Sequence, residues 1–191
     1  MANKVRYGLS NTKYAVYNNG TYGTPKDAKG AVSLSLTREG GDSSDFYADN
    51  GVYFTFAGTN GGYSADLELA YITDEMRVDL LGEVADSESG IQYETTSAEP
   101  AQFALITEMQ GDAGPIGFVF YNCKASRPEL SANTKNESPD VDTSTLNIRM
   151  AAQEFTIDGT KTGIVQGHIE KTADNAAKYA AFFAGVVIPG A

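Results

Sequence analysis

The chain has 191 residues, which suits one domain and allows roughly 70% of the unfolded surface to be buried on folding. Its content of 41% hydrophobic and 20% charged residues is ordinary for a globular protein and excludes a disordered chain. The formal net charge of −11 argues against tight binding to nucleic-acid phosphates, because such binding is driven by exchanging counterions for protein cations.

Several short segments alternate apolar and polar residues with a period of two, which predicts β-strands that each have two distinct faces. In chain order, these segments are residues 32–36, 52–56, 67–71, 103–109 and 145–150. Because they far outnumber the helical segments, we expect a mainly β fold built as a β-sandwich or barrel.

Residues 73–82 break this rhythm and predict a helix that flanks the β structure. Thr73 is placed to cap the helix, two carboxylates follow in the first turn, and Met76 and Leu80 lie four residues apart. Gly82 is suited to the left-handed conformation that ends a helix.

Residues 116–123 differ from the other strand segments because both of their faces are apolar. Such a strand is covered twice, either as a central strand of a sandwich or by a neighbouring copy of the chain on one face. The two predicted faces consist of Ile116, Phe118 and Phe120 on one side and Val119, Tyr121 and Cys123 on the other.

A second, short helix is predicted near the C-terminus, from about Ala173 to Ala184. Ala176, Tyr179 and Phe183 form one stripe along it, and Gly185 follows its end. We expect this stripe to pack within its own chain rather than to dock a partner.

The connecting segments are rich in Gly, Asn and Ser. Residues 18–21, 38–44 and 59–62 lie between strand segments at hairpin-like spacing, and residues 111–117 are expected to form a hairpin turn. Residues 135–140 contain proline and charge and predict a solvent-exposed loop. Nothing along the chain divides it, so we expect a single domain over residues 1–191.

The residues that carry most enzyme chemistry are scarce and dispersed. His168 is the only histidine and lies in a strand-like segment without a partner at ligand spacing, and Cys123 is the only cysteine and lies in an apolar strand. We therefore expect an inert core thiol, no catalytic residues, no metal site and no cofactor.

Three stretches together resemble the major tail proteins of long-tailed bacteriophages of Gram-positive bacteria. These are residues 46–50, residues 62–70 with the helix that follows them, and residues 119–128. The opening residues 4–10 and the segment 131–142, which precedes the predicted strand 145–150, fit the same order. Residues 112–118 depart from the family, because they carry no charge after Asp112 where basic residues are expected.

The resemblance implies a tail-tube subunit with a β-sandwich and a flanking helix, which forms hexameric rings that stack into the hollow tail through which DNA is delivered. It implies no catalytic residues. The implied partners are other copies of the chain, the tape-measure protein, the tail terminator and the distal tail protein. Contractile-tail inner tubes and type VI secretion tubes are similar systems.

Two sets of residues are candidates for roles in such an assembly. Phe46, Tyr47, Asp49 and Asn50 lie in a Gly- and Ser-rich region that we expect to reach an adjacent ring, the alternative being an ordinary hairpin loop whose aromatic residues fold back. Asp66 and Glu68 share one strand face and are candidates for acids that face the lumen. Acids there would repel DNA weakly and keep it from adhering.

The rival reading is a free-standing β-sandwich module that binds carbohydrate or acts as an adhesin. Sugar-binding faces often use Trp, of which the chain has none, although it has 11 Tyr. No apolar run has the length of a membrane span, and the N-terminus lacks the apolar stretch of a secretory signal. We therefore expect a protein made in the bacterial cytoplasm, and the resemblance to tail proteins implies that it ends up in the virion.

Overall fold

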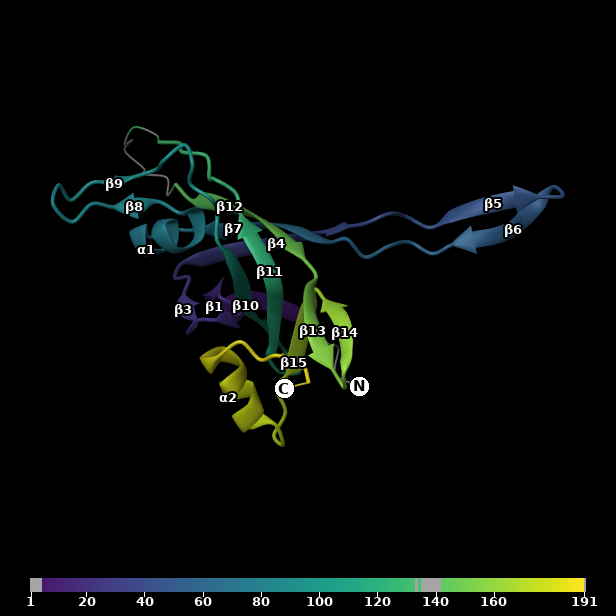
Figure 1. Cartoon of the computed structure of the whole chain (residues 1–191). Coiled ribbons are helices and arrows are strands. Elements are labelled where there is room, and N and C mark those ends of the chain that lie inside the picture. Colours follow the sequence, from purple (N-terminus) through teal and green to yellow (C-terminus); the bar gives the residue numbers. More distant parts are fainter. Residues whose placement is uncertain (1–4, 133, 135–141, 191) are drawn as a thin grey trace.

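The computed structural model describes residues 5–132, 134 and 142–190, so the predicted loop at 135–140 lies outside the described residues. Within that part of the chain the main element is an antiparallel sheet of nine strands (Figure 1). The long strands follow the order β1-β10-β11-β12-β7-β4, while β2 and β3 pair with β1 and β15 pairs with β11. The strands of this sheet are β1 (Arg6–Asn18), β2 (Thr21–Tyr22), β3 (Lys26–Asp27), β4 (Ala31–Glu39), β7 (Gly62–Leu69), β10 (Gln102–Gly111), β11 (Ile116–Ala125), β12 (Ser144–Ala151) and β15 (Gln166–Glu170).

The remaining strands form hairpins of their own. They are β5 (Ser44–Ala48) with β6 (Gly51–Phe56), β8 (Val84–Ala85) with β9 (Gln92–Tyr93), and β13 (Gln153–Ile157) with β14 (Thr160–Ile164). Every segment that alternation predicted as a strand is at least partly a strand, although β7 stops at Leu69 and leaves Tyr71 in the following loop. The prediction of a mainly β fold with two helical segments is confirmed.

The larger hydrophobic core lies on one side of the sheet, which curls so that β4 comes near β1. Leu67 and Leu69 of β7 point into this core because alternate residues of a strand face opposite sides. The other fully buried members come from the central strands, from the loop after β7 and from the helical segment that follows it, and include Tyr14, Ile72, Met76, Leu80, Phe103, Leu105, Phe120, Leu146, Ile148 and Met150.

A second, smaller core lies on the opposite side of β10 and β11, beneath the C-terminal helix α2 (Ala176–Ala184). Tyr179, Phe182 and Phe183 of α2 are buried against Ala104, Ile106, Val119 and Tyr121. The strand with two apolar faces is therefore covered on its second face by its own chain, which decides between the two alternatives left open by the sequence. The expectation that the α2 stripe packs within the chain is also confirmed.

The predicted faces of β11 need one correction. Phe118 and Phe120 face the large core and Val119 and Tyr121 face α2, as expected, but Cys123 lies in the large core with Phe120. The cause is an irregularity in the β10–β11 register, where the pairs Leu105–Phe120 and Phe103–Cys123 enclose one extra residue on β11. Such a bulge reverses the facing of every residue beyond it.

The helical segment after β7 begins and ends where the sequence predicts, but its interior differs. Thr73 caps the segment by accepting a hydrogen bond from the Met76 amide at 3.2 Å, and Gly82 ends it with φ of +74°. Only α1 (Asp74–Met76) is α-helical, and η1 (Arg77–Leu81) is a π-helical turn. The wider turn lets the adjacent Leu80 and Leu81 both be buried together with Met76.

Helix α2 is shorter at its start than predicted, since it begins at Ala176, and Gly185 follows its end as expected. No helix among the described residues has the length and apolar character needed to cross a membrane.

Candidate interaction surfaces

The β5–β6 hairpin projects far from the body of the molecule and is its most distinctive feature (Figure 1). It continues the β4–β7 pair, so that residues 40–61 form one extended structure, which we call the arm. The turn at its tip is formed by Asp49 and Asn50, both with positive φ. Residues 38–44 and 59–62, predicted as separate hairpin loops, are instead the two sides of the arm where it leaves the sheet.

The arm carries large apolar side chains that no other described part of the chain covers. Its six largest apolar side chains are each 53–73% exposed, which leaves on the order of 600 Å² of their surface open to solvent. An isolated two-stranded hairpin has marginal stability in water. Exposure of this size marks an interaction site. The six are Phe46, Tyr47, Val52, Tyr53, Phe54 and Phe56.

The two faces of the arm differ in chemistry. The pairs Phe46–Phe54 and Ser44–Phe56 place Phe46, Phe54 and Phe56 on one side, which we call the phenylalanine face, and the rings of Phe54 and Phe56 are 5.0 Å apart. On the other side the hydroxyl of Thr55 donates to Asp45 at 2.6 Å. Tyr47 follows Phe46 on β5 and is 64% exposed on the same side as Asp45, so the second face of the arm combines polar groups with an aromatic ring.

Where the arm leaves the sheet, the backbones of its two sides are in direct contact, and we call this region the neck. A Cβ atom on Gly40, which has φ of +140°, would lie 2.0 Å from the carbonyl oxygen of Thr59, and one on Gly58 would lie 2.6 Å from that of Gly41. The amide of Thr59 donates to the Gly41 carbonyl at 3.0 Å. Glycine is required on both sides of this neck because no other residue allows the chains to approach so closely.

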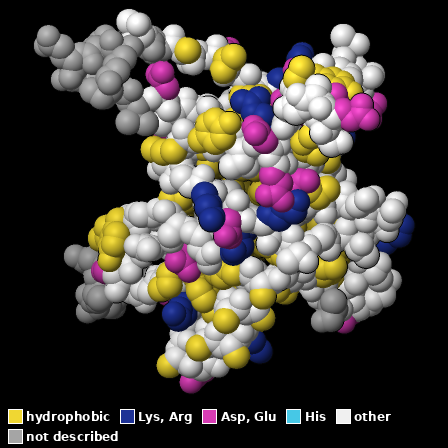
Figure 2. Space-filling view, turned by 90° about the vertical axis from the view of Figure 1, so that its left-hand side faces the viewer, with side chains coloured by type: hydrophobic (Ala, Val, Ile, Leu, Met, Phe, Trp, Pro, Cys, Tyr) yellow, Lys and Arg dark blue, Asp and Glu magenta, His cyan; other side chains and the backbone are white. Residues whose placement is uncertain are grey.

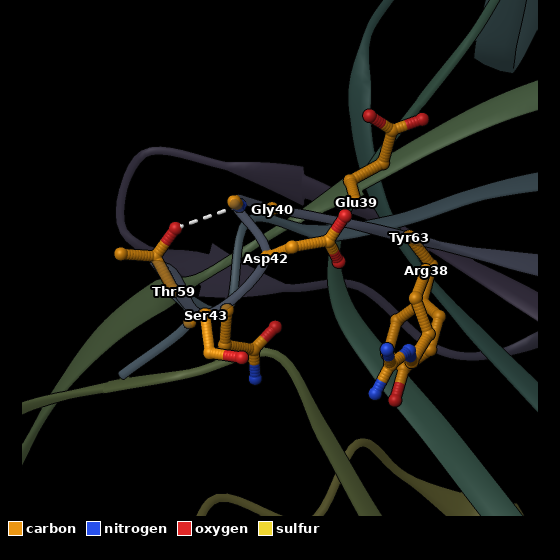
Figure 3. Close-up of a pocket in the computed structure, with 10 residues that line it drawn as sticks. Arg38, Glu39, Gly40, Asp42, Ser43, Thr59 and Tyr63 are labelled. Carbon is orange, nitrogen blue, oxygen red and sulfur yellow. Dashed lines mark hydrogen bonds between the residues drawn. The ribbon is translucent and has the colours of Figure 1, made fainter. Parts of the chain in front are cut away.

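A hollow of about 710 Å³ lies beside the neck (Figure 3). Arg38 and Tyr63 line one part of it and Ser43 and Thr59 another, and the Gly41 amide donates to the Thr59 hydroxyl at 2.9 Å. Glu39 and Asp42 also line it. The residues that line this hollow lie where the arm joins the sheet.

The outer face of β4, β7 and β12 is polar along its length, and we call it the polar sheet face. It consists of Ser33, Ser35 and Thr37 on β4, Ser64, Asp66 and Glu68 on β7, and Thr145, Asn147 and Arg149 on β12. Asp66 and Glu68 therefore share one exposed face, as predicted.

Hydrogen bonds fix both acids of the polar sheet face. Glu68 accepts from the hydroxyls of Thr143 at 2.7 Å and Ser33 at 2.8 Å, and these bonds lower the pKa of its carboxyl. Asp66 accepts from the Asn147 amide at 2.5 Å. Arg149 lies 3.8 Å from Glu39, so the face carries one cation beside its acids.

A second set of exposed apolar residues lies at the end of the β4–β7 pair opposite the arm. We call it the base patch and define it as Val32, Tyr71, Ile91 and Tyr93, which are 46–60% exposed. The Ala70 amide donates to the Gly30 carbonyl at 2.7 Å and so joins the start of β4 to the end of β7. The Gln92 side chain donates to the Asp74 carbonyl at 3.1 Å and so holds β9 beside α1. Figure 2 views the molecule from this side and shows hydrophobic side chains among acidic and basic ones.

The other residues singled out by the sequence lie elsewhere. His168 lies on β15, paired with Phe118, with the two rings 5.9 Å apart. Cys123 is fully buried, and burial raises the pKa of its thiol to about 12, which confirms a core cysteine that stays protonated. Among the described residues, no group of three or more His, Cys, Asp or Glu is placed to hold a metal ion.

Phe46, Tyr47, Asp49 and Asn50 were predicted as a reaching loop, and they occupy one strand of the arm and its tip, with the aromatic residues facing solvent. The partner strand β6 was missed as part of the same surface, because its alternating Val52, Phe54 and Phe56 fit a core strand equally well. The glycines on both sides of the neck, such as Gly40 and Gly58, were the sequence feature that could have indicated that the two strands form one hairpin.

No known protein family matches the chain, and no curated protein matches it in sequence.

Proposed function

We propose that this protein is a non-enzymatic structural subunit that assembles with copies of itself into hexameric rings, which stack into the hollow tail tube of a bacteriophage. The observation that carries the proposal is the uncovered phenylalanine face of the arm. The body of the molecule already has two filled cores, so the arm is the part that requires a partner. The resemblance of residues 46–50, 62–70 and 119–128 to major tail proteins supplies the kind of assembly.

The size of the open surface supports self-association. A standard protein interface buries about 800 Å² on each partner, and the arm offers on the order of 600 Å² of apolar side chain before any neighbouring surface is counted. A monomer that keeps so much apolar surface in water is prone to associate. The acidic net charge of −11 opposes uncontrolled association through the remaining surface.

The polar sheet face supports a channel wall. Its side chains are hydroxyls, amides and a few charges of both signs, so it offers a passing polyanion neither apolar contact nor a dense set of cations. In the proposed tube this face lines the lumen, with Asp66 and Glu68 among its acids. DNA then passes as cargo that does not adhere, and the tape-measure protein, tail terminator and distal tail protein are the partners that the resemblance supplies.

The rival function is that of a free-standing module that binds carbohydrate. The exposed rings of Tyr47 and Tyr53 in the arm favour it. These tyrosines offer stacking surfaces of the kind that sugars use. The two functions differ in the state of the concentrated protein, which is a ring or tube in the first and a monomer in the second.

The experiment replaces the phenylalanine face by the triple variant Phe46→Ser, Phe54→Ser, Phe56→Ser and compares mass by light scattering and particles by electron microscopy. Wild type is expected to form rings or tubes as its concentration rises, and the triple variant is expected to remain monomeric. Its free energy of unfolding should change by less than about 1 kcal/mol, because the replaced side chains are exposed.

Tyr7→Ser is the matched control, since Tyr7 is 58% exposed but lies on β1, outside the arm. It should assemble like wild type. Equal assembly by the triple variant, or a monomeric wild type at every concentration, would refute the proposal.

A further inference from the structure

We infer that Asn19 is a site of spontaneous covalent modification, at which the backbone nitrogen of Gly20 attacks the Asn19 side-chain amide and converts the asparagine to aspartate and isoaspartate. This reaction, deamidation, requires only the chain itself and water, so it is independent of the proposed assembly. The hydrogen bonding of the backbone distinguishes Asn19 from the other asparagines that precede a glycine.

Deamidation is a substitution followed by a hydrolysis. In the substitution, a bond forms between the backbone nitrogen of the following residue and Cγ of the asparagine, and the bond from Cγ to the side-chain nitrogen breaks. The proton of the backbone amide goes to the departing nitrogen, which leaves as ammonia, and a cyclic imide remains. Water then opens the imide at either of its carbonyls, which yields aspartate or isoaspartate. The reaction therefore requires a backbone nitrogen that is free to move toward the side chain and to lose its proton.

The chain contains three Asn-Gly pairs, at Asn19, Asn50 and Asn60. Glycine is the neighbour that hinders the attack least, because it has no side chain and the widest backbone freedom. All three asparagines are exposed to solvent. Exposure therefore does not rank them, and the surroundings of each glycine nitrogen decide.

The turn at Asn19 and Gly20 leaves the attacking nitrogen free. The two residues form the tight turn between β1 and β2, with φ of +49° and +88°. The flanking residues Asn18 and Thr21 pair with each other across the turn and take the ladder bonds, which leaves the Gly20 amide to solvent. A Cβ atom on Gly20 would meet no described atom within 4 Å. The peptide between Asn19 and Gly20 can therefore rotate through open space.

Opening of this turn disturbs little of the fold. Strand β2 is only two residues long, and its pairing with β1 consists of Tyr17–Tyr22 and Asn18–Thr21. It lies at the end of the strand order in the large sheet. The rotation that brings the Gly20 nitrogen to Cγ of Asn19 therefore needs only local opening, and the long strands stay paired.

The pair at Asn60 is held in the neck. The Gly61 amide donates to the Glu39 carbonyl at 2.8 Å, so the nitrogen that would attack is already engaged. A Cβ atom on Gly61 would lie 3.1 Å from the same carbonyl oxygen, and the Gly62 amide donates to the Asn60 side chain at 3.0 Å. Reaction at Asn60 must first separate the two backbones of the neck.

The pair at Asn50 is intermediate. Asn50 lies in the turn at the tip of the arm, with φ of +62°. The following Gly51 is the first residue of β6 and pairs with Ala48, so its amide lies in the ladder rather than in the open part of the turn. The structure therefore predicts the order Asn19, Asn50, Asn60 for the rate of deamidation.

Peptide mass spectrometry of wild-type protein tests this order. Dilute folded protein is incubated in mildly alkaline buffer, and asparagine, aspartate and isoaspartate are quantified at each site over time. We expect Asn19 to react at least about tenfold faster than Asn60, a factor that corresponds to breaking one or two backbone hydrogen bonds before the attack. Equal rates at the three sites, or a faster reaction at Asn50 or Asn60 than at Asn19, would overturn the inference.

The same protein unfolded in urea is the matched control, because it keeps the sequence and loses the turns and the neck. The three sites should then react at similar rates. A preference for Asn19 that persists in urea would show that the neighbouring sequence selects it, and would contradict the role given to the fold.

Gly51→Ala tests whether each glycine acts on its own asparagine. A Cβ atom at Gly51 would meet no described atom within 4 Å, so the fold should accept it. The added methyl group should slow deamidation at Asn50 and leave the rate at Asn19 unchanged. An equal change at both sites would contradict an attack by the adjacent backbone nitrogen.

Discussion

Gly62 shows how tightly single residues constrain the place where the arm joins the sheet. Its φ is +95°, and a Cβ atom there would lie 2.0 Å from the Met150 carbonyl oxygen of β12. Gly62→Ala is therefore expected to lower the free energy of unfolding by about 3 kcal/mol or more, since it adds backbone strain to a clash with a neighbouring strand. Gly51→Ala is the control, because nothing lies within 4 Å of its position, and it should change stability by about 0.5 kcal/mol or less. Chemical denaturation measures both, and equal stability of the two variants would show that the close approach is absent.

The thiol of Cys123 gives a second test at this scale. It is fully buried in the large core, and burial raises its pKa to about 12. The folded protein should therefore resist alkylation at pH 8 and react only after denaturation, because the thiolate is the reactive form. Val187→Cys should gain one rapidly labelled thiol in the folded state, as read by mass spectrometry. Rapid labelling of native Cys123 would contradict the packing of β11 against the core.

The C-terminal helix is the element that completes the body. Phe182 and Phe183 pack so closely over β11 that a Cβ atom on Gly117 would lie 3.0 Å from both rings, and the Tyr179 hydroxyl donates to Glu108 at 2.8 Å. Phe183→Ala is expected to cost about 3 kcal/mol of stability by leaving a cavity under α2. Lys178→Ala on the exposed side of the same helix should cost less than about 0.5 kcal/mol. Thermal unfolding of the two variants decides whether α2 is an integral part of the fold.

The elements that the sequence predicted well are those whose own residues indicate which side chains are buried or where the element begins and ends. Alternation located β10 and β12, the run with two apolar faces located β11, and the Thr73 cap and Gly82 located both ends of the first helical segment. The π turn was not predictable, because Met76 and Leu80 fit an α-helix and only packing reveals that Leu81 is buried too.

The facing of Cys123 and the nature of the arm were missed for a related reason. A bulge leaves no mark on composition, and an alternating strand such as β6 looks the same whether its apolar face meets a core, a partner or water. Of the candidate residues, the sequence correctly grouped Asp66 with Glu68 on one strand face, and it singled out Phe46 and Tyr47 as residues that reach out from the subunit, where the structure exposes them by 55% and 64%. It did not connect them to Phe54 and Phe56, because the pairing across the arm is a long-range feature.

At the scale of the whole molecule, the net charge of −11 and the apolar arm act in opposite directions. Repulsion between acidic copies keeps the protein dispersed at low ionic strength, and screening reduces that repulsion while leaving apolar attraction in place. Self-association is therefore expected to increase when NaCl is raised from about 20 mM to 500 mM, over which the Debye length falls from about 20 Å to about 4 Å. Light scattering across this range is the measurement. The triple phenylalanine variant should stay monomeric throughout, and weaker association of wild type at high salt would indicate a contact held by ion pairs.

We propose that other copies of the chain cover the phenylalanine face of the arm within a hollow assembly. Electron cryo-microscopy of concentrated wild-type protein at high salt tests it most directly. We expect stacked rings around an open channel, with Phe46, Phe54 and Phe56 buried between copies and the polar sheet face on the channel wall. Monomers at all concentrations, or an assembly in which these three side chains remain in solvent, would contradict it.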